Sequence, residues 1–262
     1  MNTQVLMTGS EEVVSSPKRL ARIAGMLYLA VAILAGFAVG YVLGRVYIPG
    51  DAAATAANLL ANAGLVRLGV VANLAQATIM IFLAMTLSRL LSHVNKNVAR
   101  AMVILVAIAT AIMCLTLVFE FAALLVATNS AYAAALGAPG AAALALLLLE
   151  MYHYGFLIAQ IFFGLWLMPL GYLAFKSGMF PKALGVVLIL AGVCYLVDLL
   201  ALFLVPDLGA SIHTFVGVIP TTLAEVWMVL YLLVVGVRVS TPGTPPASTA
   251  AIATGAQVPL QP

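Results

Sequence analysis

Six long apolar runs are the feature of this sequence that most restricts its fold. They cover about residues 23–47, 65–91, 98–127, 141–175, 183–205 and 215–237. A helix needs roughly 20 mostly apolar residues to cross the ~30 Å hydrocarbon core of a bilayer, and every run is long enough. None shows the alternation at period two that is typical of strands in a membrane β-barrel. The sequence therefore predicts an all-α, polytopic membrane protein with six transmembrane helices.

The scarcity of charge supports this prediction. Charged residues make up 7% of the 262 residues and hydrophobic residues 65%. Soluble domains carry about 25% charged residues, so this chain has too few to cover a water-facing surface of its size. We therefore expect the lipid bilayer to surround most of it. The net charge of +3 is too small to indicate a nucleic-acid partner, and we expect none.

The positions of Lys and Arg predict the orientation of the six spans. With the N-terminus placed in the cytoplasm, all of the 11 basic residues except Arg45 and Arg67 fall on the inner side. Cytoplasmic loops of membrane proteins carry this excess of positive charge, so both termini are predicted to be cytoplasmic (N-in/C-in). Lys18 and Arg19 lead into a first run that has no cleavage site, which favours a retained helix over a signal peptide.

The chain divides into a membrane domain with a tail at each end. Residues 1–17 and 240–262 are predicted to be disordered cytoplasmic tails, and residues 18–239 form the six-helix domain. The external segment from Asp51 to about residue 62 predicts a short surface helix. The fourth run exceeds the length of one crossing and contains Pro169, at which we expect a kink.

Three stretches carry a resemblance to a known family. They read "RIAGMLYLAVAILAGFAVGYV", "PGDAAATAANLLANAGLVRLG" and "IFFGLWLMPLGYLAFKSGMFPKALGVVLILAGVCYLVD". With the six-span layout, they resemble the bacterial integral membrane family filed as domain of unknown function 4386, over about residues 18–238. The most specific portion runs from Gly171 and Tyr172 to Gly185. The resemblance implies a multi-pass protein of the bacterial cytoplasmic (inner) membrane, and it implies no activity and no catalytic residue.

Polar residues inside the spans are the candidates for function. Four of the eight acidic residues lie within predicted spans, where an ionisable side chain costs at least ~2.5 kcal/mol at mid-bilayer. Most of the polar span residues fall in the outer half, so converging helix faces would form an outward-facing pocket for a small cationic ligand or protons. The candidate pocket comprises Glu120, Glu150, His153, Asp198, Glu225, Asn73, Gln76 and Tyr195, with Arg67 as charge partner. His213, in a short outer loop, is expected to cover its mouth.

The segment "EMYHYGF", residues 150–156, allows several interpretations. Glu150 and His153 share the i, i+3 spacing of di-iron bundles, but such a site needs two of these motifs and two further glutamates. The neighbouring tyrosines favour the edge of the membrane, where tyrosine is enriched. Counting residues places the segment either about 10–15 Å deep or at the outer interface. We expect no metal and no cofactor.

Small residues give two further expectations. Gly36, Gly40 and Gly44 repeat every fourth residue in "GFAVGYVLG", a pattern that favours close packing with another helix or, alternatively, a homodimer contact. Cys114 and Cys194 lie inside apolar runs and are expected to be buried apolar residues rather than disulfide partners.

Motif searches exclude several enzyme classes. The sequence contains no Walker A loop, GxSxG or HExxH. It favours a non-catalytic binding, transport or accessory protein. Two alternatives stay open: a membrane enzyme acting at the outer leaflet through Glu150 and His153, and a structural subunit of a larger membrane complex.

Overall fold

The computed structural model describes residues 16–238, and this part of the chain is helical without strands. The predicted tails lie outside the described residues, apart from Ser16 and Pro17. In chain order the elements are α1 (Pro17–Ala35), the π-helix η1 (Gly36–Leu43), α2 (Gly44–Val46), α3 (Ala52–Ala61), α4 (Ala63–Leu91), α5 (Lys96–Thr128), α6 (Ser130–Ser177), α7 (Lys182–Leu204), α8 (Pro206–Ile212), the π-helix η2 (His213–Val218) and α9 (Ile219–Val234).

Six helical segments in this part are long and apolar enough to cross a membrane, which confirms the predicted architecture. They are Pro17–Val46, Ala63–Leu91, Lys96–Thr128, Ser130–Ser177, Lys182–Leu204 and Pro206–Val234. The fourth span begins earlier than the fourth apolar run. Asn129 caps the start of its helix, and the first residues after this cap form an alanine-rich stretch. The sixth begins earlier because Pro206 starts α8 immediately after the turn that ends α7.

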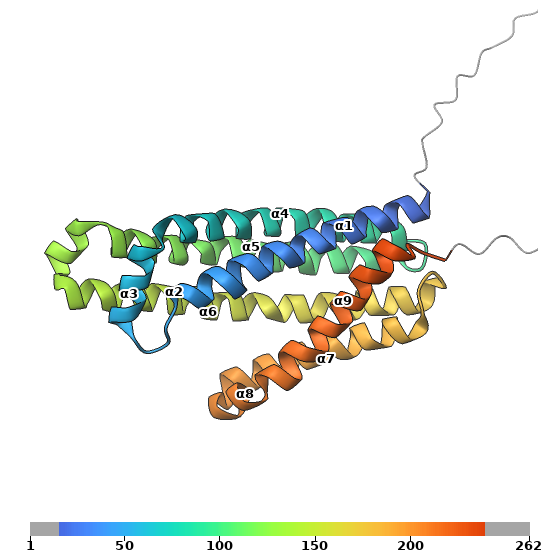
Figure 1. Ribbon diagram of the computed structural model, residues 1–262. Helices are drawn as coiled ribbons and strands as arrows, with labels where there is room; N and C mark the ends of the chain where they lie inside the picture. Colours follow the sequence, from blue (N-terminus) through green and yellow to red (C-terminus); the bar gives the residue numbers. More distant parts are fainter. Residues whose placement is uncertain (1–15, 239–262) are drawn as a thin grey trace, which may run out of the picture.

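Contacts between neighbouring spans run in a closed ring around the bundle. Spans α4, α5, α6 and α7 each pack against the next (Figure 1), α7 packs against α9, and α9 packs against α1, which returns to α4. Because α4 and α6 barely touch across the ring, its interior is shared by residues from several helices rather than filled by one central helix. The ring can therefore present side chains from distant parts of the sequence to one central space.

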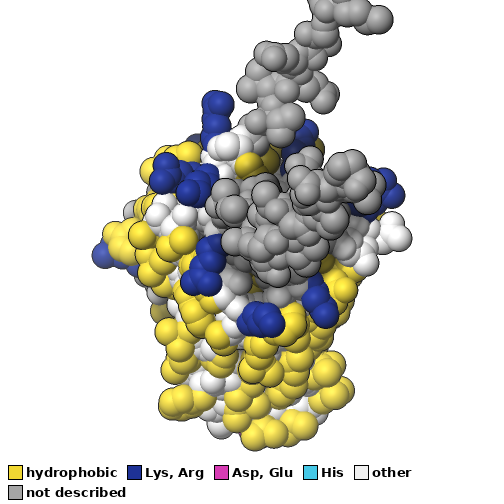
Figure 2. All heavy atoms as spheres, turned by 90° about the vertical axis from the view of Figure 1, so that its right-hand side faces the viewer, with side chains coloured by type: hydrophobic (Ala, Val, Ile, Leu, Met, Phe, Trp, Pro, Cys, Tyr) yellow, Lys and Arg dark blue, Asp and Glu magenta, His cyan; other side chains and the backbone are white. Residues whose placement is uncertain are grey.

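Basic side chains gather at one end of this ring. Figure 2 shows Lys and Arg around the end where the described chain begins and finishes. The backbone N–H of Arg238 donates to the carbonyl of Met179 there, which ties the last residues to the α6–α7 turn. We call this the basic end and the opposite one the distal end. The positive-inside rule predicts that the basic end is cytoplasmic, and the orientation stays a prediction.

Four glycines bring α6 and α7 into close contact. A Cβ atom added to Gly171 would lie 2.6 Å from the carbonyl oxygen of Gly185, and one added to Gly192 would lie 2.7 Å from that of Gly164. Gly164 and Gly171 are seven residues apart on α6, and Gly185 and Gly192 are seven residues apart on α7. The two glycines of each helix therefore lie on one face of it. The two backbones approach this closely because neither helix carries a side chain at these points.

The expectation for Gly36, Gly40 and Gly44 is wrong for packing within the chain. All three are exposed, and a Cβ added to any of them would meet no atom within 4 Å. Gly36 and Gly40 lie in π-helix η1, which packs on α4 through other residues such as Val42. The homodimer contact stays a prediction. Cys114 is likewise exposed rather than buried, because its side chain points outward from α5.

The α5–α6 hairpin extends farthest at the distal end, and α3 lies across it (Figure 1). Asp51 caps α3 by accepting from the N–H of Ala54, as the sequence indicates. The helical backbone of α6 is interrupted at Gly137, whose φ of 72° is readily adopted by glycine, and not at Pro169. The excess length of the fourth run therefore projects beyond the other spans.

The buried apolar residues form two clusters. One lies toward the basic end and includes Leu87, Met102, Trp166 and Leu184, and the other lies toward the distal end around Leu124. The polar residues of the spans, among them those expected to line the pocket, lie mainly between the two. Helices α7 and α9 contribute only to the first cluster, so apolar packing does not close the ring toward the distal end.

Candidate functional site

A central cavity of about 140 Å³ lies inside the ring, enclosed by α1, α4, α6, α7 and α9. Its lining consists of Tyr28, Val31, Ala32, Ala35, Gln76, Met80, Phe156, Gln160, Phe163, Trp166, Tyr195 and Glu225. Residues from the first and last spans meet here because α1 and α9 are neighbours in the ring. The cavity therefore depends on ring closure and not on any local motif.

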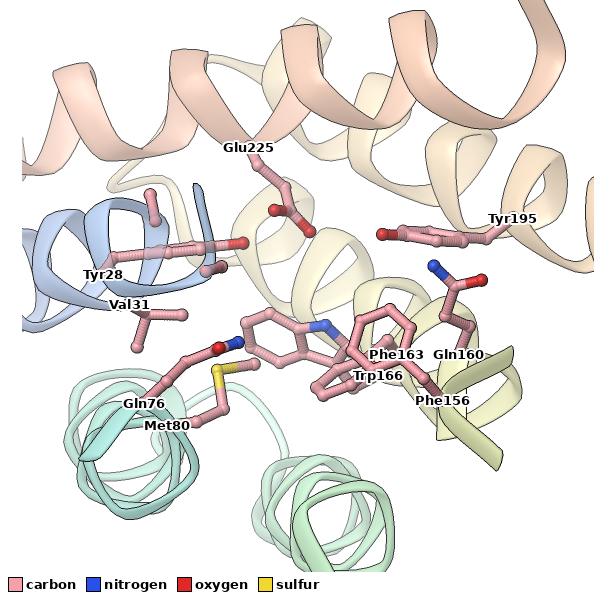
Figure 3. A pocket seen from close by; sticks show the side chains of 12 residues that line it. Tyr28, Val31, Gln76, Met80, Phe156, Gln160, Phe163, Trp166, Tyr195 and Glu225 are labelled. Carbon is pink, nitrogen blue, oxygen red and sulfur yellow. The ribbon is translucent and has the colours of Figure 1, made fainter. Parts of the chain in front are cut away.

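Glu225 is the charged residue of this lining. Figure 3 shows its carboxyl group projecting from α9, with the hydroxyl groups of Tyr28 and Tyr195 pointing toward it from opposite sides. Tyr28 is 3% exposed, and its hydroxyl has no hydrogen-bond partner. A buried hydroxyl without a partner costs free energy, so this group is available to a molecule in the cavity.

Aromatic rings and two amides complete the cavity wall. The rings of Tyr28 and Trp166 lie 5.9 Å apart between centroids, in a tilted arrangement. Gln76 and Gln160 project into the same space (Figure 3), and the buried Oε1 of Gln76 has no partner. The cavity thus combines one carboxyl group, aromatic faces and neutral hydrogen-bonding groups, an arrangement suited to a small molecule that carries positive charge.

A second cavity of about 150 Å³, the distal cavity, lies next to the first. It is lined by Val39, Leu43, Tyr152, His153, Phe156, Leu157, Gln160 and His213. Phe156 and Gln160 line both cavities and so stand between them. Since η2 packs on α7, α8 and α9 but not on η1 or α6, the ring is loosely closed at this level. The distal cavity and the central cavity are therefore neighbours that share part of one wall.

Glu150 and His153 lie at the distal end of the first span. Tyr47 is the residue that follows α2. The ring of His153 stacks on the ring of Tyr47, with 5.9 Å between the ring centroids. Burial, and then the nearby Glu150 carboxylate, raise the pKa of Tyr47. These contacts place the segment beside the end of the first span, and its depth in the membrane stays a prediction. No three His, Cys, Asp or Glu residues within residues 16–238 converge in a way that could hold a metal ion.

Asp198 pairs with His213 instead of facing the central cavity. Its Oδ2 lies 2.9 Å from Nδ1 of His213, and the two side chains are 3% and 41% exposed respectively. The carboxyl group also packs directly against Gly217, leaving no room for a Cβ there. His213 begins η2 and is not in a loop as expected, because α8 and η2 continue the helix through this region.

A double-mutant cycle should measure this contact. We expect Asp198→Ala and His213→Ala each to lower the stability of the protein, since each leaves a partner without its bond. The double variant should lose less stability than the two single variants together. We expect the difference to be about 1–2 kcal/mol, a modest value because His213 is partly exposed. Thermal unfolding in detergent measures all four proteins; strictly additive losses would show that the pair contributes nothing.

Glu120 belongs to a separate buried group between α4, α5 and α6. It is 1% exposed, and neither carboxyl oxygen has a hydrogen-bond partner. Asn73, also 1% exposed, donates from Nδ2 to the Tyr152 hydroxyl at 3.2 Å. This group lies behind the central cavity and does not line it.

The residues expected to share one pocket thus occupy several places. Gln76, Tyr195 and Glu225 line the central cavity, and His153 lines the distal one. The other candidates lie elsewhere: Asn73 and Glu120 in the buried group, Asp198 against His213, and Glu150 beside Tyr47. Arg67 is exposed, and the ion pair found within residues 16–238 is that of Asp198 and His213.

Sequence reasoning missed Tyr28, Gln160 and Trp166. Gln160 is a strongly polar residue inside the fourth apolar run, so the rule that selected Gln76 could have found it. Tyr28 and Trp166 gave no such signal, because aromatic residues are common in apolar spans. Only their contact across the ring distinguishes them.

Comparisons with known proteins identify a family and a relative and name no activity. The family described as "Domain of unknown function (DUF4386)" matches residues 23–236. An "Uncharacterized protein" of Archaeoglobus fulgidus is 35% identical over 83 residues, which are 32% of this chain and 47% of the relative. The match therefore spans about half the length of that relative. No solved structure matches the chain.

Proposed function

Since this chain belongs to the family of domain of unknown function 4386, whose description assigns no activity, we propose a function from the central cavity: reversible binding of a small organic cation or amine, as part of a transport, sensing or accessory role. The observation that carries the proposal is the Glu225 carboxyl group, which faces an otherwise uncharged, aromatic-lined cavity inside the ring.

The surroundings of Glu225 favour a cation over other ligands. A carboxylate repels anions, and the cavity offers no Lys or Arg to bind one. Aromatic faces attract organic cations with about 0.5–2 kcal/mol each, and more when water is excluded. The Tyr28 and Tyr195 hydroxyls and the two glutamines can accept hydrogen bonds from an ammonium group. An amine with an apolar body therefore satisfies both the polar and the apolar parts of the wall.

The size of the cavity limits the ligand. An engineered cavity of about 150 Å³ in another protein holds benzene, and the central cavity is of similar volume. A ligand of roughly that size, with one ammonium group, would fill it. Larger ligands would have to extend past Phe156 and Gln160 into the distal cavity.

The depth of the cavity suits a membrane binding site. Glu225 lies about 14 Å from the end of α9 and Tyr28 about 16 Å from the start of α1, at ~1.5 Å per residue. Both depths are near the middle of a ~30 Å hydrocarbon core. With the basic end in the cytoplasm of a bacterial inner membrane, the distal cavity opens this site toward the outside.

The test compares Glu225→Gln with Glu150→Gln, which removes an acid outside the central cavity. The probes are benzylamine and tetramethylammonium, with sodium benzoate as an anionic control, added to the purified full-length protein in lipid nanodiscs. Because a charge-assisted contact contributes about 1.5–3 kcal/mol, we expect Glu225→Gln to weaken cation binding by about 10- to 100-fold. Glu150→Gln should bind as the wild type does.

Calorimetry or thermal-shift titration gives the affinities. Equal binding of both cations by wild type and Glu225→Gln, or preference for benzoate, would refute the proposal. The enzyme alternative has less support, because Glu150 does not line either cavity and Asp198 is held by His213. A role as a subunit or homodimer rests on the exposed Gly36, Gly40 and Gly44, and the mass of the purified particle tests it.

A further inference from the structure

The buried group around Glu120 has more hydrogen-bond acceptors than donors. Both carboxyl oxygens of Glu120 and the Oδ1 of Asn73 are buried without any partner. The Asn73 side chain faces the Glu120 carboxyl group, and its Nδ2 donates to Tyr152. Because most buried polar atoms in proteins have a partner, three unpaired acceptor oxygens in one place indicate that something with a donor completes the group.

An added proton on Glu120 supplies the missing donor. A neutral carboxyl group carries an O–H that can donate to Oδ1 of Asn73, which pairs two of the three oxygens and leaves the carbonyl oxygen of Glu120 as an acceptor. An ionised Glu120 would instead be a buried charge without an ion pair, since no Lys, Arg or His pairs with it within residues 16–238. We infer that Glu120, Asn73 and Tyr152 form a binding site for one exchangeable proton, distinct from the central cavity.

The donor set favours a proton over a metal ion. Hard divalent cations take six or more oxygen ligands, and this group offers three free oxygens. The titratable side chain that faces Glu120 is Tyr152 on α6, while α4 brings the neutral Asn73. No fixed positive charge is present among residues 16–238 to stabilise the Glu120 carboxylate after the proton leaves. Loss of the proton must therefore be coupled to hydration or movement of the Glu120 side chain.

The site adjoins the distal cavity. Tyr152 lines the distal cavity, and its hydroxyl is the acceptor for Asn73. A proton arriving from the distal side would therefore meet Tyr152 before Glu120. Asn73 and Gln76 are three residues apart on α4, so they share a face between this site and the central cavity. Buried carboxyl groups in such positions serve as proton-binding sites in pumps and transporters.

Infrared spectroscopy of the full-length protein in lipid nanodiscs tests the inference. We expect the wild type at neutral pH to show the carbonyl band of a protonated carboxylic acid, and Glu120→Gln to lose that band. Glu225→Gln and Glu150→Gln should retain it, which separates this site from the proposed ligand cavity. Tyr152→Phe leaves Glu120 in place but removes the hydroxyl that Asn73 contacts, so it should shift the band without abolishing it.

The remaining outcomes overturn the inference. If the band persists unchanged in Glu120→Gln, another carboxyl group carries the proton. If the wild type lacks the band, Glu120 is ionised at neutral pH. If sodium chloride removes the band and sodium stabilises the wild type but not Glu120→Gln, the site binds a metal cation instead. Should Glu120→Gln fail to fold, an unshifted band in Tyr152→Phe would still reject the proposed network.

Discussion

The Trp166→Ala variant should be less stable than the wild type by about 3–5 kcal/mol in the free energy of unfolding. Trp166 is 1% exposed and is among the largest fully buried side chains. It packs on Tyr28 and forms part of the central cavity wall. Its removal would merge its own volume with an existing cavity, which the surrounding helices cannot easily collapse to fill. We expect ligand binding at Glu225 to weaken as well.

The other tryptophan provides a matched control. Trp227 lies on α9 and is 39% exposed, on the surface that faces lipid. Trp227→Ala removes the same number of atoms but leaves no enclosed cavity, so its effect should stay within about 1 kcal/mol. Thermal unfolding in a single detergent compares the two variants. Equal losses of stability would contradict the assignment of Trp166 to the core of the ring.

The Gly171→Ala variant should lose about 1–3 kcal/mol of stability, although it adds a single methyl group. The new Cβ would lie 2.6 Å from the carbonyl oxygen of Gly185 and 3.0 Å from the backbone nitrogen of Ile189. Backbone atoms cannot rotate aside as a flexible side chain can. Helices α6 and α7 would therefore have to move apart, which disturbs the face of α7 that carries Tyr195 into the central cavity.

Gly40→Ala is the control for this substitution. A Cβ at Gly40 meets no atom within 4 Å, and alanine is a better helix former than glycine by roughly 1 kcal/mol. We expect the monomer to be unchanged or slightly stabilised. Thermal unfolding and size-exclusion profiles are measured for both variants. A Gly171→Ala protein as stable as Gly40→Ala would contradict the glycine contact between α6 and α7.

The two glycine patterns show where sequence reasoning succeeds and fails. The spacing of Gly36, Gly40 and Gly44 predicts close packing, yet these residues are exposed, whereas Gly171 and Gly185 make the contact. A spacing of four shows that small residues share a helix face, but it does not show which way that face points. The direction of that face depends on how the helix packs against its neighbours.

The candidate site shows the same limit. The cost of burying polar groups in a bilayer correctly singles out Gln76, Tyr195 and Glu225 as residues inside the ring. The same argument selects Asp198 and Glu120, which lie in other environments. Depth along a span can be counted from the sequence at ~1.5 Å per residue, but the angular position around each helix relative to its neighbours cannot.

The sequence by itself determined the six helices that are long and apolar enough to span a membrane, and it predicts their orientation. Span length, apolar composition and the position of Lys and Arg are properties of local segments, and the bilayer acts on each segment separately. Only the tertiary structure decided which polar residues meet. Ring closure between α1 and α9 brings Tyr28 to Glu225, and the neighbouring packing of α4, α5 and α6 isolates Glu120. Such contacts between distant residues depend on how the helices rotate and pack against one another.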